Sequence, residues 1–455
     1  MHDQQPRFQP SAAAGNGGAG ADVTVFAGHL DLGGILRGRP LARARLEELM
    51  AVGVGWVPVN QAISPLDGIP ADAPFGAIGD LRLVPDADAL FLAHTAGPDR
   101  PPLALALGGL VELDGSPSPL CPRHLLEAAA ARLLERHGFT LKVAFEQEFT
   151  LRGCAPTPGF SLARLRAEAE LVERWHAALE EAGMELAMLL PEFGAGQFEF
   201  SLAPAGPVRA ADLAAAAREI IRDAARQMGR SVTFSPAPVV GGIGNGVHVH
   251  ISLADADGRP VGHDPAGPGG LSAPFAAFLA GVAEALPAIT YLLAPSPVSY
   301  IRLQPHRWSA AGACLGLQNR EAALRICPVH ALGGAAPAAQ FNVELRIPDA
   351  TANFYLLLAA VIEAGLAGLA RGRPPQTIVE DDVAALTPEQ RAALDIRPLP
   401  ESLADARARF LASRWATGLL PDAMLRCFDA MKRHEMEQAD GCDEDELVRR
   451  YAEVF

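Results

Sequence analysis

Apolar and polar positions follow two different spacings along the chain. Between residue 22 and about residue 114, short apolar runs of the kind found in strands surround a single stretch with helical spacing, residues 41–51. The predicted strands are residues 23–26, 55–59, 81–84 and 103–107. The following segment, residues 115–122, is rich in Ser, Pro and Gly, which is typical of a linker. The pattern therefore predicts a small α+β domain that ends near residue 115.

Longer helical patterns alternate with strand patterns in the remainder of the chain. The predicted helices are residues 122–137, 161–182, 207–228, 273–286 and 353–370, and the predicted strands are residues 141–151, 186–190, 197–202, 246–253 and 341–347. Long helices between strands predict a large α/β or α+β domain with a substantial sheet. Residues 400–455 are predicted to form helices with a charged surface. We expect a tail at 1–21, a first domain at 22–115 and a second domain at 116–455.

Four predicted strands carry charged or polar side chains on one face. Residues i and i+2 of a strand share a face, so Glu146 and Glu148 point to the side opposite Leu141, Val143 and Phe145. The other three strands place together Gln197 with Glu199, His248 with His250, and Asn342 with Glu344 and Arg346. A solvated face is the ordinary explanation for one such strand. Its recurrence on four strands favours a functional site.

These residue types suit hard divalent cations. Carboxylates with an occasional imidazole are ligands for Mg²⁺ or Mn²⁺, and two ions would be needed to offset this much negative charge. Arg302, Arg320 and Arg325, together with Arg346, are either ordinary surface arginines or groups that stabilise a phosphoryl group during transfer. The chain has neither a G-x-x-x-x-G-K-[ST] nor a G-x-G-x-x-G motif, so a nucleotide would be held without a P-loop.

Composition narrows the choice of partners. The chain has 53 Asp and Glu against 38 Lys and Arg, a net charge of -15, which argues against binding nucleic acid or anionic lipid. The six cysteines form no C-x-x-C pair, so neither a zinc ribbon nor a disulfide framework is predicted. The first twenty residues do not read as a signal peptide, and the apolar run 355–369 is interrupted by Glu363 and predicted to be too short for a bilayer. We expect a soluble cytoplasmic protein with a disordered tail.

Six motifs occur in a fixed order that resembles the glutamine synthetase family from about residue 31 onward. They are E-x-E, E-x-x-x-G-Q-x-E, N-G-x-H-x-H-x-S-L, S-Y-x-R-L-x-P, N-R-x-A-x-x-R and N-V-E-L-R-x-P-D-A-x-A-N. The resemblance implies a β-grasp domain followed by a catalytic α/β domain, whose curved sheet forms a funnel-like site. It also implies a ring-shaped homo-oligomer, hexameric or dodecameric, with sites shared between subunits.

The resemblance also implies roles for individual residues. The ligands of a metal ion beside the amino-acid substrate would be Glu148, Glu192 and Glu199, and those of an ion at the nucleotide phosphates would be Glu146, His248 and Glu344. Arg302 and Arg346 would hold the reacting carboxylate, Arg320 and Arg325 would contact the phosphates, Gly244 would contact the amino acid through its backbone, and His250 would lie on the nucleotide or substrate side. The catalytic residues would be Arg302, Arg320 and Arg346. ATP, with two to three Mg²⁺ or Mn²⁺ ions per site, would phosphorylate the γ-carboxylate of glutamate, and an amine would then displace phosphate.

Several positions depart from the family pattern. Six residues after Arg302, where glutamine synthetases carry a Glu that helps deprotonate ammonium, this chain has Trp308. A small cation leaving water needs a counter-charge, and an indole suits a larger amine better. Asp67 lies in the stretch where the family has a second ammonium-site carboxylate, but without its usual D-G-S-S context. Ile243 and Asn342 replace an Asn near the amino acid and an Arg near the nucleotide.

These departures predict a ligase that joins glutamate to an amine other than ammonia. Three alternatives stay open at this point: an ordinary glutamine synthetase, a catalytically silent member that serves as a ring-shaped scaffold, and a phosphotransferase that forms no amide bond. All six metal-ligand positions are filled, which argues against the silent scaffold.

Overall fold

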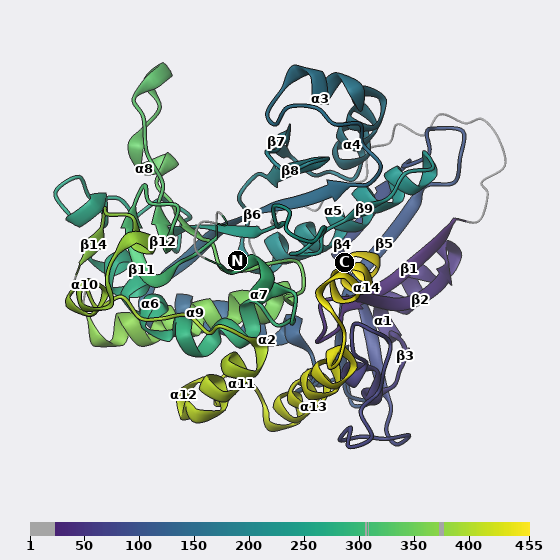
Figure 1. The fold of residues 1–455 in the computed structure, drawn as a ribbon. Helices are drawn as coiled ribbons and strands as arrows, with labels where there is room; N and C mark the ends of the chain where they lie inside the picture. The colour runs from purple at the N-terminus through teal and green to yellow at the C-terminus, as the bar shows by residue number, and fades with distance from the viewer. Residues whose placement is uncertain (1–22, 305–306, 308, 373–376) are drawn as a thin grey trace.

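A five-stranded sheet forms the amino-terminal domain. The computed structural model describes residues 23–304, 307, 309–372 and 377–455. The strands of this first sheet are β1 (Thr24–Leu30), β2 (Leu36–Ala42), β3 (Val54–Trp56), β4 (Leu81–Ala93) and β5 (Leu103–Val111). Their order is β2-β1-β5-β4-β3, with β1 and β5 parallel, and α1 (Leu46–Val52) packs against β4 (Figure 1).

The prediction for this domain was wrong at several elements: strand β2 was not predicted, and the predicted strand 55–59 ends at Trp56 and is followed by a 3-10 helix, Pro58–Ala62. Residue 41, the predicted start of a helix, lies in β2, and a 3-10 turn at Arg43–Arg45 precedes α1. Strand β2 has the sequence LRGRPLA, in which Arg37 and Arg39 alternate with Gly and Pro instead of large apolar residues. Its pairing with β1 therefore comes from backbone hydrogen bonds at a half-exposed edge, which an apolar alternation cannot reveal.

The second domain is built on a nine-stranded sheet. Its strands are β6 (Phe139–Leu151), β7 (Leu186–Pro191), β8 (Gln197–Leu202), β9 (Val232–Thr233), β10 (Val247–Asp255), β11 (Gly312–Leu317), β12 (Ala322–Ile326), β13 (Val343–Leu345) and β14 (Ile378–Val379). The order is β14-β11-β12-β13-β10-β6-β8-β7, and β9 pairs with β6. Mixed strand directions in both sheets, together with the helices around them, confirm the α+β prediction.

The helices are distributed around this sheet. They are α2 (Pro122–His137), α3 (Leu162–Ala167), α4 (Ala169–Glu181), α5 (Pro207–Gln227), α6 (Ala273–Leu293), α7 (Ser299–Arg302), α8 (Pro337–Gln340), α9 (Phe354–Arg371), α10 (Pro388–Ala393), α11 (Leu403–Ala412), α12 (Arg414–Thr417), α13 (Asp422–Ala439) and α14 (Glu444–Val454). Predicted helices 122–137, 207–228 and 353–370 are confirmed to within one residue at each end. The predicted helix 161–182 is two helices, α3 and α4, and α6 continues past Pro287, where the pattern predicted its end.

Strands β11 and β12 were not predicted, although the second carries the last residues of the N-R-x-A-x-x-R motif. The sequence of β11, GACLGL, is short, rich in small residues and almost entirely buried. A strand that is covered on both faces shows no alternation of apolar and polar positions, so periodicity gives no signal.

The helices cover one face of the large sheet and leave the opposite face of its central strands to polar residues. On the covered face, Phe145 of β6 lies against Phe354 of α9 with ring centroids 5.0 Å apart, and Phe149 lies 5.1 Å from Trp175 of α4. The ribbon shows α2, α6 and α9 on one side of β6, with α3 and α4 beside β7 (Figure 1). The predicted alternation on β6 follows from this arrangement, because Leu141, Val143 and Phe145 are buried.

Within the described residues, two helices, α6 and α9, are long and apolar enough to cross a membrane, judged by length and composition alone. The expectation that the apolar run around residues 355–369 is too short is therefore wrong, because α9 has 18 residues. Both helices belong to the core: they pack against each other, and 72% of the residues in the most apolar window of each are buried. Burial within the fold accounts for their apolar composition.

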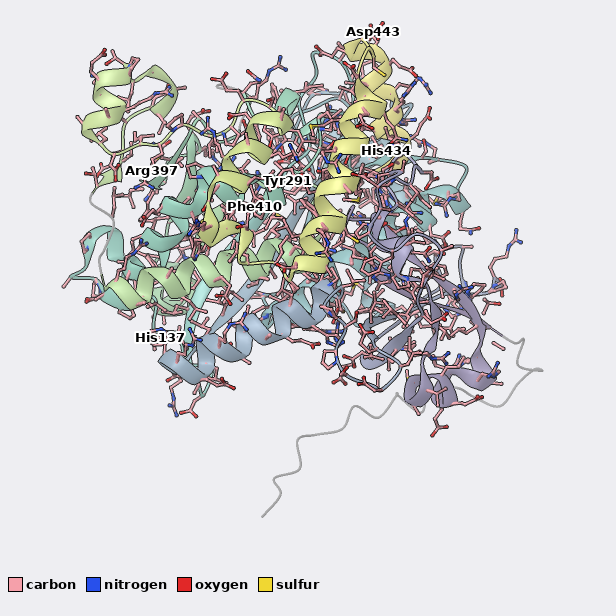
Figure 2. All side chains as sticks on the ribbon, turned by 90° about the horizontal axis from the view of Figure 1, so that it is seen from below. His137, Tyr291, Arg397, Phe410, His434 and Asp443 are labelled. Carbon is pink, nitrogen blue, oxygen red and sulfur yellow. The ribbon has the colours of Figure 1, made fainter. Side chains whose placement is uncertain are left out.

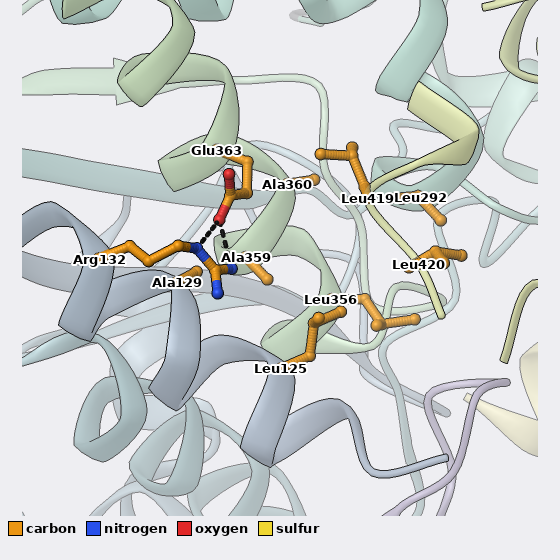
Figure 3. A pocket seen from close by; sticks show the side chains of 10 residues that line it. All are labelled: Leu125, Ala129, Arg132, Leu292, Leu356, Ala359, Ala360, Glu363, Leu419 and Leu420. Carbon is orange, nitrogen blue, oxygen red and sulfur yellow. Dashed lines mark hydrogen bonds and ion pairs between the residues drawn. The ribbon is translucent and has the colours of Figure 1, made fainter. Parts of the chain in front are cut away.

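Glu363, which interrupts that apolar run, has a partner in the fold. It accepts a hydrogen bond from Nε of Arg132 on α2 at 2.7 Å. The pair closes one end of a small cavity of about 10 Å³, shown in Figure 3, whose other walls are apolar side chains of α2, α6, α9 and residues 419–420. The half-buried carboxylate is thus paired with a cation between two helices.

The carboxyl-terminal helices join the two domains. Gln438 of α13 accepts a hydrogen bond from Ser64 Oγ at 2.7 Å, and Phe455 O accepts one from Thr233 Oγ1 at 2.8 Å. Further along, Phe410 of α11 lies against Tyr291 of α6 with ring centroids 5.4 Å apart. Both residues are labelled in Figure 2. The last helices therefore fix the first domain against the large sheet.

Candidate active site

Strand register places the ionisable residues of the sheet opposite one another. On β6, Glu146 faces His248 of β10, and Glu148 faces Glu199 of β8. Glu344 of β13 lies opposite His250 on one side and Arg325 of β12 on the other. Five adjacent strands therefore contribute to one continuous polar face, and the local i, i+2 pattern on each strand becomes a two-dimensional array of side chains.

Glu146 is the centre of the first half of this array. His248 Nδ1 lies 2.9 Å from Glu146 Oε1, and His250 Nε2 lies 3.2 Å from Glu146 Oε2. Burial alone would raise the pKa of Glu146, but its hydrogen bonds with His248 and His250 outweigh burial and lower the pKa well below its ordinary value. Glu146 is therefore a carboxylate held in its ionised form between two imidazoles.

Glu344 is deeply buried beside this group. Arg325 Nη1 donates to Glu344 Oε2 at 2.9 Å, Arg346 contacts Oε1, and His248 Nδ1 lies 3.3 Å from the same oxygen. Burial opposes ionisation, but the charges of His248 and Arg346 prevail and lower the pKa of Glu344 to about 2. Cations already surround this carboxylate, so its charge is compensated within the protein.

The second half of the array, around Glu148, has too few cations. Glu148 Oε2 accepts hydrogen bonds from Gly246 N at 2.6 Å and from Gln197 Nε2 at 3.3 Å. Burial and then the charges of Glu146, Glu148 and Glu192 raise the pKa of Glu199 to about 10. The pKa of Glu192, at the carboxyl end of β7, is also raised, first by burial. Crowding of these acidic side chains favours the protonated form of Glu199, and a bound cation would favour its ionised form.

Two sets of three side chains in the described part of the chain are close enough to share a cation. Glu146, Glu199 and His248 form one set, and Glu146, His250 and Glu344 form the other, with candidate ligand atoms within 4.8 Å of one another. Oxygen donors with imidazole fit Mg²⁺ or Mn²⁺. The grouping differs from the one that the resemblance implies, because Glu146 belongs to both sets and His250 joins the second.

The four arginines occupy different places in the structure. The guanidinium of Arg302 is buried and donates to Ile347 O at 3.0 Å, Pro348 O at 3.1 Å and Arg346 O at 3.0 Å. Its Nη2 also lies 3.4 Å from His248 Nε2, so Arg302 adjoins the histidine that contacts Glu146. Arg346 and Arg325 contact Glu344, whereas Arg320 is exposed in the turn after β11.

The loop that leads into β10 lies close to Arg302. Gly244 O accepts a hydrogen bond from Gln197 Nε2 at 3.0 Å. A Cβ atom on Gly246 would lie 2.4 Å from Arg302 Nη2 and 2.9 Å from His248 Nε2. A Cβ here would force Arg302 or His248 to move, which explains the Gly of the N-G-x-H-x-H motif. Ile243 is half-buried in the same loop.

The structure says less about the two predicted amine-site positions, Trp308 and Asp67. Trp308 lies outside the described residues. Its neighbour Arg307 donates to Gly242 O at 3.0 Å, which connects this segment to the loop before β10. Asp67 is exposed, has a φ of 57° and forms an ion pair with Arg37 at 3.2 Å.

His250 contributes both to the carboxylate array and to a contact with Cys327, whose Sγ lies 3.9 Å from Nδ1.

Sequence reasoning missed one residue that organises the array. Arg164 of α3 is 3% exposed and donates to Glu192 O at 2.6 Å. It lies 28 residues before Glu192 on a helix whose pattern resembles any amphipathic surface, so no local signal identifies it. Gln197 was placed on the correct face, but its role in joining Glu148, Gly194 and Gly244 depends on the fold.

Comparison with known proteins matches both domains. The glutamine synthetase N-terminal domain family matches residues 23–118, and the glutamine synthetase catalytic domain family matches residues 119–451. A gamma-glutamylpolyamine synthetase of Streptomyces coelicolor is 36% identical over 95% of this chain and 94% of its own length. A glutamate–isopropylamine ligase of a Pseudomonas species is 27% identical over 95% of each chain.

A solved structure described as a novel glutamine synthase homolog shares the fold. It superposes with a TM-score of 0.88 at 42% sequence identity, covering 99% of this chain and all of that chain. The two family matches, the two relatives that align over nearly their whole length, and the solved structure all indicate the same family as the six sequence motifs. The chain therefore belongs to the glutamine synthetase family of ATP-dependent acid–amine ligases.

Proposed function

We propose that this protein couples the γ-carboxylate of glutamate to an amine other than ammonia. The observation that carries the proposal is Trp308, which replaces the Glu expected six residues after Arg302. A site for ammonium needs carboxylates to replace its hydration, and an indole cannot supply that charge. The names of the two relatives above, a polyamine ligase and an isopropylamine ligase, support an organic amine as the second substrate.

The polar face supplies a place for the first chemical step. As the family resemblance implies, Glu148, Glu192 and Glu199 would hold an ion beside glutamate, and Glu146, His248 and Glu344 would hold one at the phosphates. His250 Nε2 lies 3.2 Å from Glu146 Oε2. Bound divalent ions would offset the negative charge of the nucleotide and of the transferring phosphoryl group. Arg302 and Arg346 would orient the glutamate carboxylate, Gly244 would contact the amino acid, and Arg320 and Arg325 would contact the phosphates.

The reaction has two balanced steps. An oxygen of the glutamate γ-carboxylate attacks the γ-phosphorus of ATP, the bond to the β-phosphate oxygen breaks, and an acyl phosphate and ADP result. The amine nitrogen then attacks the acyl carbon, phosphate leaves with the electrons of the carbon–oxygen bond, and the nitrogen loses a proton. The surrounding protein has to exclude water between the steps, because water would also attack the acyl phosphate.

The assembly and location of the protein are part of the same proposal. We infer a ring-shaped homo-oligomer, hexameric or dodecameric, in which a neighbouring subunit completes each site, and a cytoplasmic location. Asp67 would lie near the site of a neighbour. Mass photometry of the purified protein tests the ring, and a monomer with full activity would contradict the shared site.

Product analysis tests the activity. Purified protein with ATP, glutamate and Mg²⁺ is incubated with ammonium or with ethanolamine, putrescine, spermidine, isopropylamine or aniline, and phosphate release and amide mass are measured. We expect release with an organic amine and little with ammonium, and a Glu148→Ala variant should lose the activity. The highest kcat/KM with ammonium would instead identify a glutamine synthetase. Phosphate release without any amide would identify a phosphotransferase, and the lack of any turnover would favour the scaffold.

A further inference from the structure

Two aromatic side chains are exposed side by side next to the carboxylate array. Phe160 is 54% exposed and Phe193 is 53% exposed, and their ring centroids lie 6.3 Å apart with an angle of 31° between the planes. Phe160 has a φ of 54°, a left-handed conformation that a bulky side chain adopts only at a cost of about 1–3 kcal/mol. The fold therefore holds a large apolar side chain in an unfavourable conformation, with half of its surface in contact with water.

The pair adjoins the part of the array that has excess negative charge. Phe193 directly follows Glu192, and its backbone N–H donates to Glu192 Oε2 at 3.0 Å. The next residue, Gly194, donates its N–H to Gln197 Oε1 at 2.9 Å, and Gln197 Nε2 in turn donates to Glu148. The backbone of Phe193 thus contacts Glu192 directly, and the next residue is connected to Glu148 through Gln197.

A buried arginine fixes the two aromatic segments against each other. Arg164 donates to Thr157 Oγ1 at 3.0 Å and Thr157 O at 2.6 Å, and on the other side to Glu192 O at 2.6 Å and Gly194 O. The backbones also touch, because a Cβ on Gly159 would lie 2.9 Å from the Cα of Phe193. A guanidinium taken out of water has to be satisfied, and its four acceptors belong to Thr157, to Gly194 and to Glu192, which directly precedes Phe193. The placement of the rings is therefore well determined.

The two segments offer an apolar surface without charges. Residues 157–162 have the sequence TPGFSL and residues 193–196 have the sequence FGAG, so neither contains an ionisable side chain. Leu162, at the end of the first, is 71% exposed. A ligand that lies here would place a polar end toward Glu192 and Glu148 and a carbon skeleton over the rings. A second positive charge on that skeleton would find no carboxylate in either segment.

We propose that the Phe160–Phe193 pair receives the carbon skeleton of the amine substrate, so that the preferred amine is a primary monoamine with an apolar alkyl or aryl arm. This inference rests on the proposed ligase function and specifies its second substrate. Phe160 and Phe193 are specificity-determining residues, and Arg164 is a positioning residue that acts through them.

The test compares amines of graded length in the full-length enzyme. kcat/KM is measured for methylamine, ethylamine, propylamine and butylamine, and for putrescine, which has the same four carbons as butylamine and a second ammonium. Each methylene buried on the rings should raise kcat/KM about 4-fold, since one CH₂ contributes about 0.8 kcal/mol. Butylamine should exceed putrescine at least about 10-fold. A preference for putrescine would overturn the proposal.

Variants assign the effect to the rings. Phe160→Ala and Phe193→Ala should each raise the KM for butylamine about 10-fold and flatten the chain-length series, while the KM values for glutamate and ATP stay unchanged. Leu332→Ala, which truncates a side chain that is 77% exposed in the segment between β12 and α8, is the matched control and should change none of them. Equal KM values for butylamine in both aromatic variants and the control would overturn the proposal. A changed oligomeric state with an unchanged amine series would also overturn it and assign the pair to a subunit contact.

Hydroxylamine separates failure of this inference from failure of the proposed function. It is small enough to trap an acyl phosphate without contact to the rings, and the product is a hydroxamate that is measured by colour with iron(III). Wild type and both variants should form the hydroxamate at similar rates, which also shows that the variants fold. If wild type forms neither hydroxamate nor any amide, the ligase function itself is refuted. Normal hydroxamate formation with an unaltered amine series refutes the aromatic site alone.

Discussion

Replacement of Glu199 by Gln tests whether the carboxylate array is a cation site. Without a cation, the pKa of Glu199 is raised to about 10 by burial and by its acidic neighbours, so the side chain is protonated at neutral pH. Gln has nearly the same shape as a protonated Glu and carries no charge. We therefore expect Glu199→Gln to change the free energy of unfolding by less than about 1 kcal/mol in EDTA at pH 4.5, where the carboxyl of the unfolded chain is also partly protonated.

Mn²⁺ should stabilise wild type more than it stabilises Glu199→Gln. A ligand at 100 times its Kd stabilises the folded state by about 2.7 kcal/mol. If loss of one ligand weakens binding about 100-fold, the same Mn²⁺ concentration stabilises the variant by only about 0.4 kcal/mol. Chemical unfolding with and without Mn²⁺ measures both values. The exposed residue Glu173 provides a matched control, because Glu173→Gln should retain the full stabilisation.

The pH dependence of unfolding gives an independent check with a defined sign. The pKa of Glu199 is higher in the folded protein than its ordinary value of 4.5, so the folded state binds the extra proton between these values. In EDTA, the contribution of this proton to stability is complete below pH 4.5 and is lost as the pH rises toward 10. Wild type should therefore lose stability relative to Glu199→Gln over that range. Equal stabilisation of both proteins by Mn²⁺, or a variant that unfolds far more easily in EDTA, would refute the reasoning.

Three further predictions concern stability and packing. Gly246→Ala places a Cβ 2.4 Å from Arg302 Nη2, so it should lower the free energy of unfolding by about 1–3 kcal/mol and reduce the rate of phosphate release. A variant with wild-type values in urea unfolding and in the phosphate assay would contradict this prediction. Phe455→Ala removes a side chain that is 1% exposed and should cost about 3–5 kcal/mol in urea unfolding, whereas an unchanged midpoint would show that the terminus is not packed. Burial lowers the pKa of His29 from 6.5 to about 4, so between these two pH values the unfolded state binds one more proton than the folded state. As the pH falls from 6.5 to 4, the free energy of unfolding of the amino-terminal domain should therefore decrease by up to about 3.4 kcal/mol. A His29→Gln variant should lack that acid dependence in unfolding followed by tryptophan fluorescence.

The part of the site that lies on strands could be predicted because its signal is local. On β6, Glu146 and Glu148 are two positions apart and therefore share a face of the strand, and the same alternation predicted that His248 and His250 share a face on β10. Alternation cannot supply the register between strands. The structure shows that Glu146 contacts both histidines, so the two groups of side chains that could hold a cation share it. Whether these side chains bind the metals in the groups that the resemblance implies stays a prediction.

The parts that could not be predicted depend on contacts between distant segments. Arg164 joins a loop after β6 to the turn after β7, and nothing in its own helix distinguishes it from a surface arginine. Strand β2 lacks apolar alternation because it is a half-exposed edge, and β11 lacks it because it is buried on both faces. In each case, the environment of the segment determines the structure more than its periodicity does.

The two halves of the site differ in what supports them, and this difference has a kinetic consequence. The carboxylates lie on paired strands, where a change at Glu146 or Glu199 alters the charge that both chemical steps share. The aromatic pair lies on connections, and Arg164 holds it to Glu192 through backbone contacts. A substitution in the sheet should therefore reduce hydroxamate and amide formation by the same factor. A substitution in the connections should reduce amide formation with a long amine and leave hydroxamate formation unchanged. The ratio of the two rates thus assigns any variant to one half of the site, even while the natural amine is unidentified.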